Sequence, residues 1–209
     1  MRSAMGILGC LIVMGLGCTQ EGGGAAKKRE PATSLAGKKA VLVIAPKDFR
    51  DEELQEPLDL LKASGCEVAI ACASLDEAVG MLGAKVKPGV LLKDVKVADC
   101  DAVVFVGGVG AEAYFDDPIA HGLVKEAAAG GKIVAAICVA PSILARAGVL
   151  KGKRATAWES QKDDLVKCGA RWAEGPAVRD GRFVTGNGPK AAREFARLLV
   201  QAIAHPEGP

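Results

Sequence analysis

The chain has 209 residues, of which 50% are hydrophobic, 25% are charged and 4% are aromatic, and its formal net charge is +2 at pH 7. Such balanced charge with few aromatic side chains argues against a nucleic-acid-binding protein, and the high apolar fraction excludes a collagen-like or intrinsically disordered chain. Seven cysteines are too few for a disulfide-dense miniprotein of this length. The composition therefore predicts one globular domain with additional terminal residues.

The N-terminal residues resemble a bacterial lipoprotein signal. Arg2 precedes the apolar run MGILGCLIVMGLGC, which is short for a membrane span but suits the hydrophobic region of a secretory signal. The run ends in Leu16 and Gly17 before Cys18, as in a lipobox, where a signal peptidase cuts and a lipid is attached. We therefore expect a signal peptide over residues 1–17 and lipidation of Cys18. An uncleaved membrane anchor and a misassigned start are the alternatives.

Residues 18–37 combine glycines, charges and Pro31 without an apolar period, which predicts a flexible tether. The folded domain is then expected over residues 38–209. Thr19 follows Cys18, so the aspartate that retains bacterial lipoproteins at the inner membrane is absent. We expect a protein of the bacterial cell envelope, anchored to the membrane through the lipid on Cys18 and facing the periplasm, with the outer membrane favoured over the inner.

The remaining residues alternate between strand and helix patterns. Apolar, β-branched runs predict buried strands, and leucines at helical spacing with acids in the first turn predict helices. Strands are expected at 39–46, 66–74, 101–108 and 132–138, short strands within 78–95, and helices at 51–64, within 111–131 from Pro118 onward, and at 141–148. The tail predicts a strand at 155–158, a helix at 159–169, a strand pair at 177–186 and a helix at 191–204. This alternation predicts a doubly wound α/β sandwich with a mostly parallel sheet.

Three loops of such a fold fall where ligands bind, beyond the carboxyl ends of the strands. They follow Pro46, contain Gly107 and Gly108, and contain Cys138. Cys138 lies between an apolar strand and the helix that Pro141 opens, an arrangement that resembles a nucleophile elbow. A helix amino terminus there is expected to lower the pKa of the thiol and make it reactive. An inert, buried cysteine is the alternative.

Two further groups are expected beside the thiol. Gly107 and Gly108 let the backbone approach closely, and the N–H groups of Gly108 and Val139 can form an oxyanion hole. Glu53, in the first helix, can reach the sulfur of Cys138. The alternatives are an ordinary strand-ending turn for the glycine pair and a solvated first helical turn for Glu53.

Four segments together resemble the DJ-one/PfpI superfamily, which has the class I glutamine-amidotransferase-like, flavodoxin-type fold. They are PKDFRDEELQEP, VVFVGGVGAE, AAICVAPSILARAGVLKGKRAT and KDDLVKCGARW with AVRDGRFVTGNGP, and the resemblance extends over residues 38–204. It implies that Cys138 is the reactive cysteine and that Glu53, four residues before Pro57, is a protonated carboxyl that hydrogen-bonds the cysteine sulfur or its oxidised forms. It also implies an N–H from the glycine pair in the same pocket, and a homodimer.

The sequence departs from this family pattern at several positions. Val139 stands where peptidase-like members have the histidine of a Cys-His dyad, and Trp158 stands where deglycase-like members have another histidine. Asn187 replaces a basic residue. The histidines of the chain, His121 and His205, are expected to be solvated. Hydrolysis by a histidine-assisted thiol is therefore not expected, while Trp158 is expected to shape the pocket.

The residues and the resemblance together predict a cysteine-dependent protein that acts on small reactive carbonyls, such as methylglyoxal or its protein adducts, as glyoxalases and deglycases do. The alternative is a redox-sensing protein whose Cys138 is reversibly oxidised without substrate turnover. A hydratase and a catalytically inactive binding domain are weaker alternatives, so whether the protein is an enzyme of hydrolase or lyase type stays open. The partner is a small-molecule electrophile or oxidant, and no cofactor is expected. No metal-ligand spacing links Cys66, Cys72, Cys100 and Cys168, which are expected to be structural. Disulfide pairing among them in an oxidising compartment is the alternative.

Overall fold

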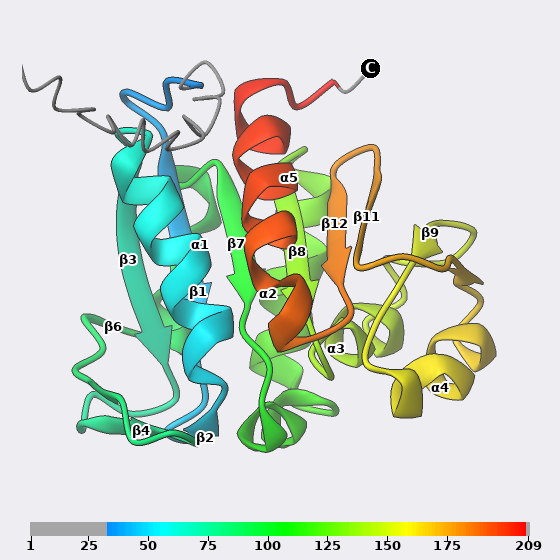
Figure 1. Cartoon of the computed structure of the whole chain (residues 1–209), viewed down its shortest axis with the longest axis horizontal. Helices are drawn as coiled ribbons and strands as arrows, with labels where there is room; N and C mark the ends of the chain where they lie inside the picture. Colours follow the sequence, from blue (N-terminus) through cyan, green and yellow to red (C-terminus); the bar gives the residue numbers. More distant parts are fainter. Residues whose placement is uncertain (1–32, 208–209) are drawn as a thin grey trace, which may run out of the picture. The chain divides into compact units, whose positions relative to one another are not determined.

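The computed structural model describes residues 33–207, and its centre is a seven-stranded sheet in the order β11-β12-β8-β7-β1-β3-β6 (Figure 1). Only the β11–β12 pair is antiparallel. The strands are β1 (Lys39–Val43), β3 (Glu67–Cys72), β6 (Val90–Leu91), β7 (Ala102–Phe105), β8 (Ile133–Ile137), β11 (Ala177–Asp180) and β12 (Phe183–Gly186). The central strands β7 and β8 are buried along their whole length, as expected for a parallel sheet covered on both faces. The α/β prediction is confirmed.

Helices cover both faces of this sheet. They are α1 (Asp51–Ala63), α2 (Pro118–Ala129), α3 (Pro141–Arg146), α4 (Lys162–Lys167) and α5 (Ala192–Ala204). Five 3₁₀ turns supplement them: η1 (Leu92–Asp94), η2 (Val97–Asp99), η3 (Val109–Tyr114), η4 (Glu159–Gln161) and η5 (Pro189–Ala191). The helices α1 and α5 pack against each other on one face, while α2 packs with α3 behind the sheet (Figure 1). The Asp117 side chain accepts hydrogen bonds from the N–H groups of Ile119 and Ala120, so α2 begins at Pro118 as predicted.

Two smaller sheets complete the domain. One contains β2 (Lys47–Phe49), β4 (Ala78–Gly80) and β5 (Lys85–Val86), and the other contains β9 (Arg154–Ala155) and β10 (Arg171–Trp172). The short strands within 78–95 are confirmed, but β2 and β10 were not expected. Both are too short to show a period of their own, and their partners in the sheet lie far away in the sequence. Tertiary pairing alone therefore defines them.

The described chain begins at the end of the sheet where the parallel strands start (Figure 1). Leu35 is buried in the core, and its N–H donates to the carbonyl of Ser64 at 2.7 Å. The folded domain thus begins a few residues before Lys38, the expected start. The predicted signal peptide over residues 1–17, the lipidated Cys18 and most of the tether lie outside the described residues. Within residues 33–207, no helix has the length and apolar character to cross a membrane.

Candidate functional site

Cys138 occupies the sharp turn directly after β8. Its φ of 65° is in the left-handed region, which costs a residue with a Cβ about 1–3 kcal/mol and is retained where the surroundings enforce it. Two hydrogen bonds do so: the N–H of Cys138 donates to the carbonyl of Gly186 at 2.9 Å, and its own carbonyl accepts from Trp158 N–H at 2.7 Å. The side chain is nearly buried, with 9% exposure. The turn thus holds the thiol in one place, between two loops.

Glu53 is a fully buried carboxyl beside this thiol. It is the third residue of α1 and has 0% exposure. Neither carboxyl oxygen has a hydrogen-bond partner of normal geometry among residues 33–207. Burial raises its pKa to about 7, although the nearby Cys138 thiol, the Arg50 guanidinium and the N–H of Gly107 oppose this shift. A buried carboxyl without a hydrogen bond of normal geometry is costly for the fold, so its position calls for a chemical explanation.

The glycine pair allows the thiol and the carboxyl to meet. A Cβ on Gly107 would lie 2.5 Å from the Cβ of Cys138 and 2.5 Å from Oε2 of Glu53. Gly108 has a φ of 95°, and a Cβ there would lie 2.3 Å from the carbonyl oxygen of Asp48. Any side chain at either position would therefore displace the site. The pair does more than end the strand β7.

The charges of Cys138 and Glu53 disfavour each other. Burial first, and then the Glu53 carboxylate, raise the pKa of Cys138 to about 12, while the N–H groups of Gly108 and Val139 lower it. The expected lowering of the thiol pKa is therefore wrong when Glu53 is ionised, because the backbone donors do not offset burial and the adjacent negative charge. Two buried, interacting groups titrate as a pair. Between the two pKa values the pair holds one proton, which either the sulfur or the carboxyl can carry.

Arg50 is a site residue that the sequence analysis missed. Its N–H donates to the carbonyl of Gly107 at 2.9 Å, and its side chain pairs with Glu52 at 2.8 Å. The guanidinium also lowers the pKa of Glu53. Its position directly before the acidic first turn of α1 was the available signal, but the sequence does not show that this turn faces β7.

The remaining titratable candidates lie apart from the thiol. No histidine is among the groups that shift the pKa of Cys138. His121 is half-buried, with Nε2 2.7 Å from the carbonyl oxygen of Phe115, which corrects the expectation that it is solvated, whereas His205 is exposed. The five cysteines of residues 33–207 are all free thiols. In the same residues, no cluster of three or more His, Cys, Asp or Glu side chains could hold a metal ion.

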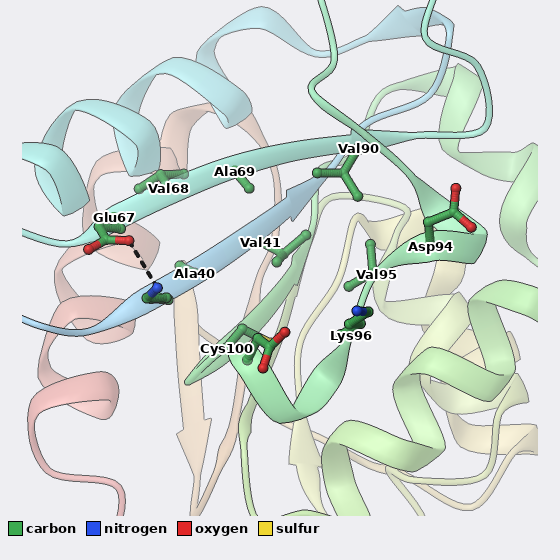
Figure 2. A pocket seen from close by; sticks show the side chains of 12 residues that line it. Ala40, Val41, Glu67, Val68, Ala69, Val90, Asp94, Val95, Lys96 and Cys100 are labelled. Atoms are coloured by element: carbon green, nitrogen blue, oxygen red, sulfur yellow. Dashed lines mark ion pairs between the residues drawn. The ribbon is translucent and has the colours of Figure 1, made fainter.

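Two pockets lie at different ends of the sheet. One, of about 400 Å³, contains Trp158 and Asn187 and adjoins the elbow. The other, of about 330 Å³, lies where β1 and β3 begin (Figure 2). Figure 2 shows its valine and alanine side chains, with Glu67 and a dashed ion pair along one side. The partner of Glu67 in this ion pair is Lys39, at 3.2 Å. Ligand sites of open α/β sheets lie beyond the carboxyl ends of strands, so the first pocket, whose Trp158 N–H donates to the carbonyl of Cys138, is the better candidate for a ligand site.

Residues 38–202 match the model of the DJ-1/PfpI family. The chain belongs to this family. It is 34% identical to the deglycase PfpI of Pyrococcus furiosus, over 76% of this chain and 98% of that protein. It is 30% identical to the glutathione-independent glyoxalase DJR-1.2 of Caenorhabditis elegans, over 82% of this chain and 92% of the relative.

Among solved structures, the ThiJ/PfpI domain protein of Brachyspira murdochii superposes with a TM-score of 0.78 at 30% identity. The match covers 80% of this chain and 98% of that one. Family membership and fold thus agree with the resemblance carried by the sequence motifs.

Proposed function

We propose that this DJ-1/PfpI protein is a cysteine-dependent enzyme that converts small reactive carbonyls, of which methylglyoxal is the simplest. Cys138 acts as the nucleophile and Glu53 moves the proton. The observation that carries the proposal is the fully buried carboxyl of Glu53, which has no hydrogen-bond partner of normal geometry and lies beside a thiol held at a strained turn. The similarity to a named glyoxalase and a named deglycase supports the same chemistry.

The first step is addition of the thiol to the aldehyde. The sulfur of Cys138 forms a bond to the aldehyde carbon, and the thiol proton passes to Glu53. Negative charge develops on the aldehyde oxygen, where the N–H groups of Gly108 and Val139 can donate to it. Glu53 then protonates this oxygen, which gives a hemithioacetal and restores the carboxylate. A carboxyl whose pKa is about 7 is suited to accept and return a proton near neutral pH.

The second step is an internal redox rearrangement followed by hydrolysis. The Glu53 carboxylate removes the proton from the former aldehyde carbon and returns it to the neighbouring carbonyl carbon, while the hydroxyl proton of the hemithioacetal passes to the oxygen of that neighbouring carbonyl. The first carbon is thereby oxidised to a thioester and the second is reduced to an alcohol, so no external oxidant or cofactor is required. Water then cleaves the thioester, which releases a 2-hydroxy acid and regenerates the Cys138 thiol. No step requires a histidine.

Methylglyoxal turnover by Cys138→Ser tests this proposal. We expect the rate of 2-hydroxy acid formation to fall by about 1,000-fold or more, as when a covalent nucleophile is removed. Cys66→Ser is the matched control, because Cys66 is also a buried thiol whose pKa burial raises, to about 11, but it directly precedes β3, at the end of the sheet opposite to Cys138. Unchanged turnover in Cys138→Ser, or equal losses in both variants, would contradict the proposal.

A second function, reversible oxidation of Cys138, is favoured by the absence of histidine among the groups that shift its pKa. A peroxide would transfer one oxygen to the sulfur, which gives a sulfenic acid while the peroxide is reduced to water or an alcohol. The N–H groups of Gly108 and Val139 and a protonated Glu53 would hold the added oxygen. Mass spectrometry after mild peroxide treatment should find oxygen on Cys138 before the other cysteines. Equal oxidation of Cys168, which is more exposed, would exclude this function.

The envelope location and the homodimer remain part of the proposal. Cys18 lies outside the described residues, so its lipid anchor stays a prediction. Support for a homodimer comes from exposed apolar side chains on and around the β4–β5 hairpin. These are Leu75, Val79, Met81 and Leu82. Clustered exposed apolar side chains of this kind are typical of protein contact surfaces.

A further inference from the structure

The pocket beside Trp158 adjoins the elbow through two backbone connections. Trp158 N–H donates to the Cys138 carbonyl at 2.7 Å, and the carbonyl of Gly186, which precedes Asn187 and Gly188, accepts from Cys138 N–H at 2.9 Å. Both loops that hold the thiol therefore continue into the walls of the pocket. Its volume of about 400 Å³ falls within the range of about 300–1,000 Å³ typical of small-molecule sites. A three-carbon aldehyde would leave most of it empty.

The indole of Trp158 offers an unoccupied surface to this pocket. It is 47% exposed, although large aromatic side chains are usually well buried. Part of the ring rests on Gly188, where a Cβ would lie 2.7 Å from Cε3. In the described part of the chain, no hydrogen bond or cation engages the indole of Trp158. The ring is thus supported from one side by backbone and open elsewhere.

The other tryptophan of the pocket is already engaged. Nε1 of Trp172 donates to Glu174 at 2.7 Å, and the ammonium of Lys162 lies 5.3 Å from the centre of its ring. Lys162 also approaches Glu174 at 3.8 Å and Glu159 at 3.9 Å. Lys162 and Lys190, which also lines the pocket, equal in charge the two acidic groups at the rim, so a charged ligand of either sign gains little there.

Two polar side chains of the pocket wall, Asn187 and Thr156, are paired within the protein. Asn187 Nδ2 donates to the carbonyl of Gly175 at 3.2 Å, and Thr156 Oγ1 donates to the same carbonyl at 3.3 Å. The remaining lining includes the rings of Pro176 and Pro189. What the pocket offers a ligand is therefore mainly an indole with apolar rings around it, which suits a flat, uncharged group.

We propose that Trp158 is a specificity-determining residue that stacks against a planar, uncharged substituent of the carbonyl substrate. This inference rests on the proposed function, because it places the reacting aldehyde at Cys138 and the substituent in the adjoining pocket. The preferred substrates are then 2-oxoaldehydes that carry an aryl group, for which phenylglyoxal is the simplest probe. Methylglyoxal fits the same thiol site but does not reach the indole.

The test compares the two aldehydes in the full-length chain. We expect Trp158→Ala to lower kcat/KM for phenylglyoxal by about tenfold, which is the effect of losing one aromatic contact. The kcat/KM for methylglyoxal should change by less than about twofold. Trp158→Phe, which keeps a flat ring, should retain most of the preference. Val166→Ala is the matched control, because Val166 is an exposed apolar residue of α4 outside the pocket lining, and it should leave the ratio of the two values unchanged.

A binding measurement separates failure of this inference from failure of the proposed function. Because the chain has two tryptophans, Trp172→Phe combined with Cys138→Ser leaves Trp158 as the only indole and removes the nucleophile. We expect acetophenone to quench its fluorescence in a saturable manner. Saturable quenching in this double variant, together with no turnover of either aldehyde by the unsubstituted chain, would overturn the proposed function but keep the pocket assignment. If the unsubstituted chain turns over methylglyoxal but quenching in the double variant is linear and does not saturate, the role of Trp158 is overturned. Equal losses of kcat/KM for both aldehydes in Trp158→Ala would overturn it as well.

Discussion

The two ends of the central sheet each hold a buried thiol near a carboxyl group, yet they are built differently. Where β1 and β3 begin, Asp101 pairs with Lys38 at 3.1 Å and accepts from the N–H of Lys39 at 2.9 Å, and the nearby Cys66 bonds only to backbone. Where the strands end, Glu53 has no such partners and lies against Cys138. Burial raises the pKa of both thiols, so burial alone does not identify the functional one.

The difference lies in what the fold leaves unsatisfied. At the start of the strands, the carboxyl groups of Asp101 and Glu67 have lysine partners, and the pocket of Figure 2 is lined mainly by short apolar side chains. At the other end, a buried carboxyl without a hydrogen bond of normal geometry and a residue in the left-handed region are both retained. Each of these is a cost to stability. Costs concentrated at one end of a sheet indicate that this end carries the chemistry.

The largest expected effect comes from placing a methyl group between the Cys138 thiol and the Glu53 carboxyl. A Cβ on Gly107 would lie 2.5 Å from both the Cβ of Cys138 and Oε2 of Glu53. We therefore expect Gly107→Ala to lower methylglyoxal turnover by about 100-fold or more, because it pushes the thiol and the carboxyl out of their reacting positions. Crowding should also reduce the free energy of unfolding by about 1–3 kcal/mol. Steady-state kinetics and urea unfolding measure the two effects.

Gly89→Ala is the matched control for this substitution at the other pocket. Gly89 directly precedes Val90, which lines the pocket at the start of the strands, and a Cβ on Gly89 would have no atom within 4 Å. We expect unchanged turnover and nearly unchanged stability. Equal losses of turnover in Gly89→Ala and Gly107→Ala would show that the chemistry is not confined to the end of the sheet that holds Cys138 and Glu53.

An intermediate effect is expected from the charge of Glu53. Its pKa rises from 4.5 to about 7 in the folded protein, so the folded state binds its proton more tightly than the unfolded chain does. The unfolding free energy should therefore fall as the pH rises between these values, by up to about 3 kcal/mol. Glu53→Gln should remove this decrease, which urea unfolding across the same pH range would detect. An identical pH dependence in both proteins would argue against a buried, protonated carboxyl.

The smallest effect is expected at the paired carboxyl. Burial raises the pKa of Asp101, but the N–H of Lys39 and the ammonium of Lys38 outweigh this and lower the pKa below 3.8. The stability from this pair is present above that pH and is lost as the pH falls further. Because both side chains are partly exposed, Lys38→Ala should cost less than about 1 kcal/mol near neutral pH. Urea unfolding should show this cost disappearing in acid, whereas a cost that persists there would assign Lys38 a role in packing.

The sequence by itself determined the elements whose signals are local. The β-branched runs of β1, β7 and β8, the leucines of α1, and Pro118 after Asp117 each carry their period or cap within a few residues, so the α/β architecture followed from them. The motif around Cys138 likewise predicted a sharp turn after a buried strand. The family motifs placed Glu53 and the glycine pair next to it.

Only the tertiary structure decided the features that depend on distant neighbours. The strands β2 and β10 exist through pairing with segments far away in the sequence. The sequence suggested a lowered thiol pKa from a helix terminus, but burial and the Glu53 carboxylate reverse its direction. The indole of Trp158 rests on Gly188 on one side, whereas the indole of Trp172 donates a hydrogen bond to Glu174. This difference between the two tryptophans appears only in the folded chain. A linear pattern carries propensities and spacings, whereas desolvation and charge at a site arise only when segments from different parts of the chain meet.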